Sequence, residues 1–106
     1  MALEALSALA HETRLDVFRS LVQAGPAGLP AGEIAEDHDV LQNTMSSHLG
    51  ILNRAGLIAK TRSGRTILYS ANYGAMKELL LYLLEDCCRG DSKICSPIAD
   101  ALACIC

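Results

Sequence analysis

The chain has 106 residues, about half of them apolar, and a formal net charge of −3 at pH 7. This length allows one modest core, so we expect a single domain. The longest wholly apolar run, residues 79–84, is far shorter than the roughly 18 residues of a membrane helix. No long apolar stretch precedes the first basic residue, Arg14, so we expect no secretory signal or transit peptide, and a cytoplasmic protein with no membrane partner.

The charge is distributed unevenly along the chain. Residues 1–39 hold seven acids and two bases, residues 40–77 hold five bases and no acid, and residues 78–106 hold five acids and two bases. A local excess of positive charge attracts phosphate even when the whole chain is acidic. The middle segment is therefore a candidate nucleic-acid surface, and a solvated basic face is the alternative interpretation.

Two helices are predicted at the start of the chain. Residues 3–10 are densely apolar and rich in Ala, and residues 12–24 carry apolar side chains at helical spacing before Gly25-Pro26 ends the pattern. The residues that form this second pattern are Leu15, Phe18, Leu21 and Val22.

A helix-turn-helix arrangement is predicted next. Gly28, Pro30 and Gly32 indicate a loop, and residues 33–38 indicate a short helix with Ile34 and Ala35 inward. A turn at Asp39-Val40 leads into a longer helix that begins at Gln42-Asn43-Thr44 and closes at Ala55-Gly56. The residues of this longer helix that face the core are Met45, Leu49 and Leu52.

The periodicity changes after Gly56. Residues 57–62 and 66–70 are β-prone and are joined through Ser63-Gly64-Arg65, which predicts a hairpin with Arg62 and Arg65 at its tip. A helix-turn-helix followed by a basic hairpin is a winged helix. The expected fold class is therefore mainly α with a small β-hairpin.

A last helix is predicted from Tyr73 to about Cys88. Residues 79–84 are apolar on every side of this helix, and one small domain cannot cover them all. We therefore expect a partner, and the simplest partner is a second copy of the chain, packed through the first and last helices.

These residues together resemble the ArsR family of metal- and metalloid-responsive repressors. The resemblance covers residues 1–88, and residues 89–106 form a Cys-containing tail beyond it. It rests on His11-Glu12-Thr13-Arg14-Leu15, Ser46-Ser47-His48-Leu49, Arg54-Ala55-Gly56-Leu57-Ile58, Gly64-Arg65 and Tyr69. It implies a cytoplasmic homodimer of winged helices that binds double-stranded operator DNA, expected to be near-palindromic, and leaves it when an ion binds.

The resemblance also assigns the longer helix as the recognition helix, whose N-terminal side chains meet base edges in the major groove. Arg62 and Arg65 are expected to touch phosphate or the minor groove. Most of the helix candidates also have an alternative role. Gln42 and Asn43 could cap the helix, Ser46 and Ser47 could belong to a solvated face, and His48 could be hydrogen-bonded to its neighbours. The recognition-helix candidates are Gln42, Asn43, Thr44, Ser46, Ser47 and His48.

All five thiols of the chain fall within its last twenty residues, with no His near them in sequence: Cys87, Cys88, Cys95, Cys104 and Cys106. A cluster of sulfur ligands selects zinc, copper(I) or trivalent metalloids rather than oxygen-loving cations.

The family carries arsenic and zinc sites at other positions, and this chain lacks both of them. Residues 33–43 contain no Cys, and residues 73–88 contain no His. Cys87, Cys88 and Cys95 look like another arsenic-type arrangement of the family, which implies As(III) as the inducer. Sb(III) and an organoarsenical are alternatives, and Cys104 and Cys106 are secondary candidates as ligands.

Other interpretations of the thiols remain open. Cys87 or Cys88 could form a disulfide with Cys95 in a redox-sensing regulator, four thiols could hold a structural zinc, and the thiols could be inert. The chain has no Gly-rich cofactor loop, nucleophile elbow or phosphate cradle, so we do not expect an enzyme. A dimeric interaction module without DNA binding is a further alternative.

Overall fold

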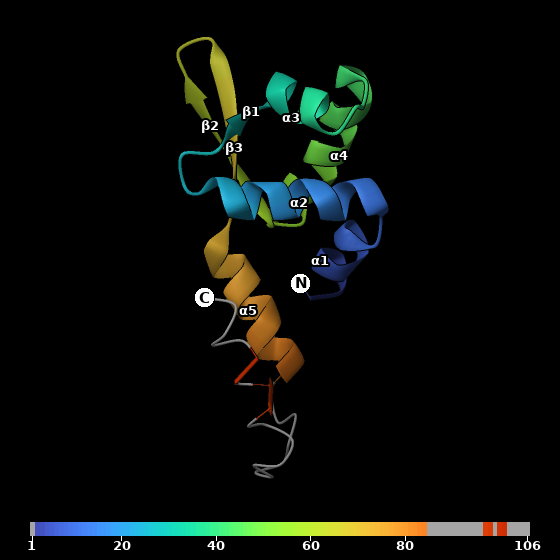
Figure 1. Ribbon diagram of the computed structural model, residues 1–106, viewed down its shortest axis with the longest axis vertical. Coiled ribbons are helices and arrows are strands. Elements are labelled where there is room, and N and C mark those ends of the chain that lie inside the picture. The colour runs from blue at the N-terminus through green and yellow to red at the C-terminus, as the bar shows by residue number, and fades with distance from the viewer. Residues whose placement is uncertain (1, 85–96, 99, 102–106) are drawn as a thin grey trace.

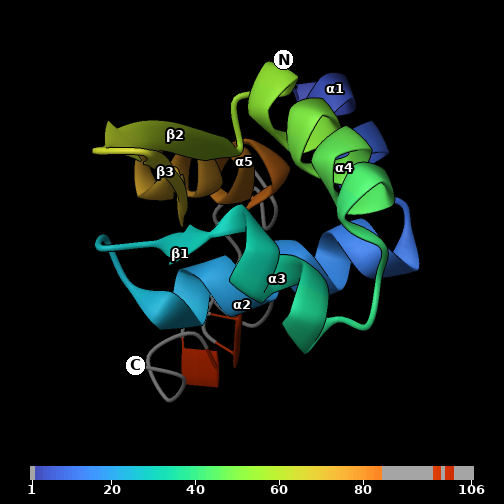
Figure 2. The same ribbon diagram turned by 90° about the horizontal axis from the view of Figure 1, so that it is seen from above.

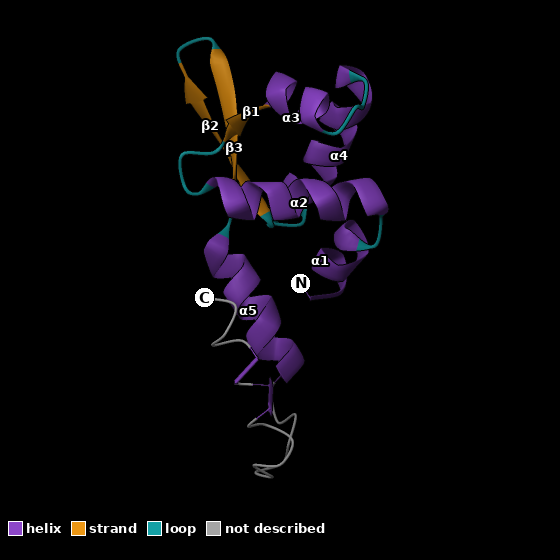
Figure 3. Ribbon diagram, viewed as in Figure 1, coloured by secondary structure: helices purple, strands orange, loops and turns teal. Residues whose placement is uncertain are grey.

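The computed structural model describes residues 2–84, 97–98 and 100–101. Figures 1 and 3 show helices and a small sheet on either side of α2, with α3, α4 and the hairpin on one side and α1 and α5 on the other. The expected fold class, a mainly helical winged helix-turn-helix, is confirmed. In chain order the elements are α1 (Ala2–Leu9), α2 (Glu12–Ala24), β1 (Leu29–Pro30), α3 (Ala31–Asp37), α4 (Gln42–Arg54), β2 (Ile58–Ser63), β3 (Thr66–Ala71) and α5 (Tyr73–Leu84).

The two helices predicted at the start of the chain are present. His11 is the N-cap of α2, with extended backbone (φ −151°, ψ 130°), and its side chain accepts a hydrogen bond from the backbone N–H of Thr13. The buried face of α2 differs from the apolar pattern at one point, because Leu15 is 42% exposed while Val17 is fully buried. The pattern had omitted Val17, and the packing of α2 against the other helices decides which of the two faces the core.

The helix-turn-helix unit comprises α3 and α4. Ile34 and Ala35 of α3 are buried, as predicted. Asp39, with a left-handed φ of 52°, lies in the turn before α4. In α4 the predicted inward residues Met45, Leu49 and Leu52 are fully buried. These side chains fix the rotation of α4 about its axis and so decide which residues face solvent.

The loop predicted at Gly28, Pro30 and Gly32 is wrong in part. Leu29 and Pro30 form the short strand β1, which pairs antiparallel with β3, and Gly32 belongs to α3. Pro30 is tolerated because β1 is an edge strand of the sheet, whose order is β1-β3-β2. Gly28 has a φ of +76°, and a Cβ at this position would collide with the carbonyl oxygen of Tyr69.

The predicted hairpin is formed by β2 and β3. Their register pairs Ile58 with Ala71 and Ser63 with Thr66, so the connecting turn is Gly64-Arg65. Only Ile58 of β2 is buried, and the strand therefore projects as a wing from the core with its polar residues in solvent.

The core lies between the helices and the base of the sheet, and none of its buried members comes from α5. The first residue of α5 is tied to the core by a hydrogen bond of 2.9 Å that the Tyr73 hydroxyl donates to the carbonyl oxygen of Val22. The segment of the predicted last helix beyond Leu84 lies outside the described residues. Within the part of the chain that the structure describes, no helix is long and apolar enough to cross a membrane.

Candidate nucleic-acid interface

One face of the molecule presents both α4 and the wing. In the view of Figure 2, α3, α4 and the hairpin of β2 and β3 lie nearest the viewer, and α1 and α5 lie behind them. The residues of α4 that the sequence assigns to DNA are on the surface, because the opposite side of the helix is held in the core. Gln42, Asn43, Thr44, Ser46 and Ser47 are exposed, and His48 is partly buried.

The start of α4 bears on the capping role considered for Gln42 and Asn43. The N-cap of the helix is Leu41, which makes no side-chain hydrogen bond to the helix. Gln42 and Asn43 therefore follow the cap as the first helical residues and do not occupy the capping position. Their exposed amides stand at the positive end of the helix dipole, where anionic groups bind favourably.

The two serines differ in their local bonding. Ser47 Oγ donates to the carbonyl oxygen of Asn43 at 3.5 Å, a bond within the helix. Ser46 and Ser47 are both exposed, and this exposure fits a solvated face and a DNA contact equally well.

His48 is contacted by two residues at the start of α2, the N-cap residue His11 and Arg14. Its Nδ1 lies 3.4 Å from Nη1 of Arg14, and its ring centroid lies 4.7 Å from that of His11, with the ring planes inclined by 49°. Partial burial, and then the positive charges of His11 and Arg14, lower the pKa of His48 from its ordinary value of 6.5. The neutral ring is therefore favoured at pH 7. The alternative role expected for His48, hydrogen bonding to neighbours, therefore applies to its Nδ1 atom, which contacts Arg14.

The wing carries the basic residues predicted to meet phosphate. Arg62 Nε donates to the carbonyl oxygen of Gly64 at 3.1 Å, which folds this side chain against the turn, and Arg65 is exposed at the tip. Lys60, exposed on β2, belongs to the same basic segment and was not named as a site residue from sequence.

Arg14 is a neighbour of the candidate residue His48 that the sequence did not predict. In sequence, Arg14 belongs to the stretch His11-Glu12-Thr13-Arg14-Leu15 that carries part of the family resemblance. Nothing in this local pattern indicates that its guanidinium reaches His48, 34 residues away.

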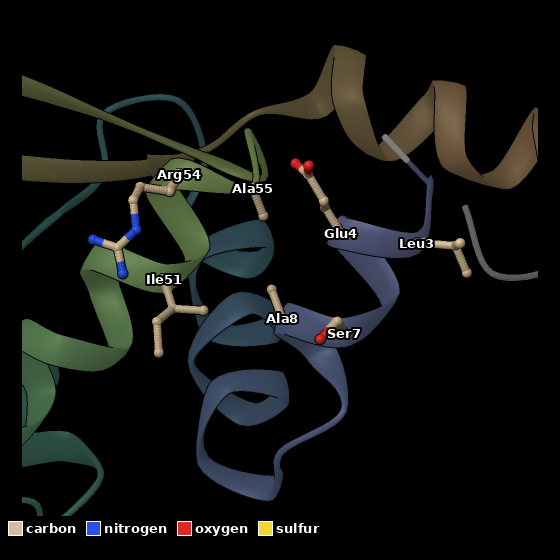
Figure 4. Close-up of a pocket in the computed structure, with 7 residues that line it drawn as sticks. All are labelled: Leu3, Glu4, Ser7, Ala8, Ile51, Arg54 and Ala55. Atoms are coloured by element: carbon tan, nitrogen blue, oxygen red, sulfur yellow. The ribbon is translucent and has the colours of Figure 1, made fainter.

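A groove of about 510 Å³ lies between α1 and the end of α4. Figure 4 shows Ala8 of α1 and Ile51 of α4 lining it, with the acidic side chain of Glu4 and the basic side chain of Arg54 also at its border. The groove is lined by none of the α4 residues that are candidate DNA contacts.

The predicted thiol ligands Cys87, Cys88 and Cys95, and the secondary candidates Cys104 and Cys106, lie outside the described residues. Among the residues that are described, no group of three or more His, Cys, Asp or Glu side chains is arranged to hold a metal ion.

A helix-turn-helix with a wing and a polar outward face on its second helix defines a DNA-binding protein of the winged-helix class. The helix-turn-helix domain family matches residues 9–61, half of the chain.

Two curated relatives support the same class. The transcriptional repressor SdpR of Bacillus subtilis is 30% identical over 87 residues, which cover 82% of this chain and 93% of that protein. The transcriptional activator HlyU of Vibrio cholerae is 27% identical over 86 residues, which cover 81% of this chain and 77% of that protein.

Solved structures extend the likeness to the three-dimensional fold. An ArsR-like transcriptional regulator from Rhodococcus sp. RHA1 is 25% identical, with a TM-score of 0.70 over 98% of this chain and 88% of that one. Reduced HlyU from Vibrio cholerae is 32% identical, with a TM-score of 0.61 over 77% of this chain and 86% of that one. The chain belongs to the helix-turn-helix family and is a transcriptional regulator of the ArsR-like type. Its relatives are regulators and not enzymes, which weighs against an enzyme.

Proposed function

We propose that this regulator is a homodimeric repressor that binds a near-palindromic operator and is released when trivalent arsenic binds its C-terminal thiolates. The observation that carries the DNA-binding part is the single face that bears both the polar side of α4 and the basic wing. The side chains of α4 enter the major groove, and Arg62 and Arg65 of the wing contact the phosphate backbone.

The homodimer is supported by the exposed apolar surface of α5 and α1. Exposed fractions on α5 are 42% for Leu80, 59% for Leu81, 63% for Tyr82 and 49% for Leu83, and Leu3 of α1 is 81% exposed. An apolar surface of this kind is stabilised when a second copy covers it. A twofold dimer places two α4 helices on successive major grooves, about 34 to 36 Å apart, and so favours a near-palindromic site.

The inducer is proposed from the chemistry of the thiols. Five thiols with no His near them in sequence suit a soft ion, and As(III) is the first choice, with Sb(III) or an organoarsenical next. Cys87, Cys88 and Cys95 are the proposed ligands, and Cys104 and Cys106 the secondary ones.

Inducer binding near the end of α5 reaches the DNA-binding face through the packed elements. The bond from Tyr73 to Val22 ties α5 to α2, and α2 packs against α4. A coupling of about 1 to 3 kcal/mol, typical of allostery, corresponds to a roughly 5- to 150-fold loss of operator affinity.

The test is a DNA-binding titration under reducing conditions. The probe is the tightest duplex that the reduced wild-type protein selects from a random pool, and arsenite is added to the complex. We expect arsenite to release the wild-type protein and to leave the triple variant Cys87→Ser, Cys88→Ser, Cys95→Ser bound. The matched control Cys104→Ser, Cys106→Ser should respond like wild type. Arsenite-resistant wild-type binding, or release of the triple variant, would overturn the proposal.

Redox sensing through a disulfide is the second candidate. It is favoured by the crowding of the thiols in sequence and by the similarity to the solved structure of reduced HlyU. The same duplex separates the candidates, because diamide should then release the protein, dithiothreitol should restore binding, and arsenite should add nothing. A structural zinc would instead be detected as bound metal in the purified protein, and its removal by a chelator would unfold or inactivate the dimer.

A further inference from the structure

Three helices meet at the guanidinium of Arg14. Arg14 belongs to α2 and is partly buried. Its Nε donates to the carbonyl oxygen of Ala8 in α1 at 2.6 Å, and its Nη1 lies 3.4 Å from Nδ1 of His48 in α4. One side chain therefore links α1 and α2 to the helix that faces DNA.

The contact with α1 fixes the guanidinium. Ala8 lies in the last turn of α1, where carbonyl oxygens have no partner within the helix and a nearby cation is favourable. A planar guanidinium with one edge bonded to this carbonyl has little freedom to rotate, so the position of Nη1 next to His48 is set by α1.

The contact with α4 fixes the proton of the imidazole. A guanidinium has only N–H donors, so the nitrogen of His48 that it meets, Nδ1, must be the acceptor. The neutral ring then carries its hydrogen on Nε2. The neutral ring of the neighbouring His11 likewise carries its hydrogen on Nε2, because its Nδ1 accepts a hydrogen bond from the backbone N–H of Thr13 at 3.2 Å.

Partial burial, and then the neighbouring positive charges, lower the pKa of His48 and so favour the neutral ring. The groups of the neighbouring α2 segment that face it are His11 and Arg14, both able to carry positive charge, and no carboxylate bonds to it among the described residues. Protonation would place a second N–H, on Nδ1, against the N–H of Arg14. The contact is therefore present at neutral pH and lost in acid.

We propose that Arg14 is a positioning residue for DNA recognition, which holds His48 as the Nε2–H tautomer so that α4 presents one fixed N–H donor to the major groove. Such a donor meets the acceptors of a base edge, N7 or O6 of guanine, N7 of adenine or O4 of thymine, and does not meet the amino group of cytosine. This inference rests on the proposed DNA contact through α4, and it adds a residue outside that helix that decides what the helix reads.

Four protein forms test the role of Arg14. Arg14→Met keeps an apolar stem and removes the donors, and Arg14→Lys restores one donor. His48→Gln places an amide N–H₂ near the position of Nε2, and this donor does not depend on a tautomer. The double variant Arg14→Met, His48→Gln completes a double-mutant cycle. Circular dichroism and urea unfolding confirm that each form is folded before it is compared.

The first measurement is the ¹⁵N NMR spectrum of the imidazole of His48 in the free protein at neutral pH. We expect the Nε2–H pattern in wild type and in Arg14→Lys, and a mixture of tautomers in Arg14→Met. An Nδ1–H or mixed ring in wild type would overturn the proposal without any use of DNA.

The second measurement is affinity for the duplex selected by wild type, with a scrambled duplex as the reference. One neutral hydrogen bond predicts a loss of about fivefold on the selected duplex for Arg14→Met, with a smaller loss for Arg14→Lys. The same Arg14→Met change in the His48→Gln protein should cost nothing further. An equal loss in both backgrounds would make Arg14 merely structural and refute the proposal. If wild type selects no duplex, the proposed function fails, and the NMR result still decides whether Arg14 sets the ring.

Discussion

The pairing of β1 with β3 brings Gly28, the residue before β1, close to the backbone of Tyr69 in β3. At Gly28→Ala, the new methyl group meets the carbonyl oxygen of Tyr69 closely enough that the backbone must shift, and φ is +76°. The left-handed conformation alone costs an Ala residue about 1 to 2 kcal/mol. Displacement of β1 from β3 adds the loss of one or two backbone hydrogen bonds, each worth about 0.5 to 1.5 kcal/mol.

Gly56→Ala is the matched control for this change. Gly56 has a φ of +80°, and a Cβ there meets nothing within 4 Å. It follows α4 in a Schellman turn, with its N–H bonded to the Asn53 carbonyl and the N–H of Leu57 bonded to the Leu52 carbonyl. Gly56→Ala therefore carries the conformational cost alone, about 1 to 2 kcal/mol, whereas Gly28→Ala should cost about 1.5 to 5 kcal/mol.

Urea unfolding followed by circular dichroism measures both free energies of unfolding. The difference between the two variants reports the collision with Tyr69. Equal destabilisation by Gly28→Ala and Gly56→Ala would refute the close approach of Gly28 to β3.

Three further outcomes are expected. Tyr73→Phe should lower the free energy of unfolding by about 0.5 to 1.5 kcal/mol in the same urea experiment, because it removes the bond to Val22, and an unchanged value would contradict that bond. Since the pKa of His48 is lowered on folding, the unfolded chain takes up a proton first in acid. Wild type should therefore lose stability relative to His48→Gln as pH falls below about 6.5, with no difference above it, and a constant difference across pH would contradict this sign. Arg65→Ala should weaken binding to all duplexes and reduce the slope of log affinity against log salt by about one, and an unchanged slope would show that the wing does not meet phosphate.

Much of the fold was predictable because helices and hairpins leave local patterns. Met45, Leu49 and Leu52 recur at the spacing of one helix face, and all three are buried. The change to β-prone residues after Gly56 predicted the hairpin within one residue at each strand end. β1 was missed because two residues, one of them Pro, carry no periodicity, and their strand exists only through pairing with β3.

The candidate site divides in the same way. The identity of the polar residues on α4 and of the basic residues on the wing was read from sequence, because a helix that buries one face must expose the other. The capping role considered for Gln42 and Asn43 could not be excluded from sequence, since it depends on where the helix begins, and the structure places Leu41 at the cap.

By itself, the sequence determined the chemistry available to this protein: a basic central segment, a helix with one polar face and thiols gathered in the last twenty residues. These properties follow from residue types and from neighbours within a few positions. Only the tertiary structure decided that Arg14 meets His48 across 34 residues and that Leu29 pairs with Tyr69. Such contacts arise when helices pack on a shared core, and the packing brings together side chains whose separation along the chain carries no periodic signal.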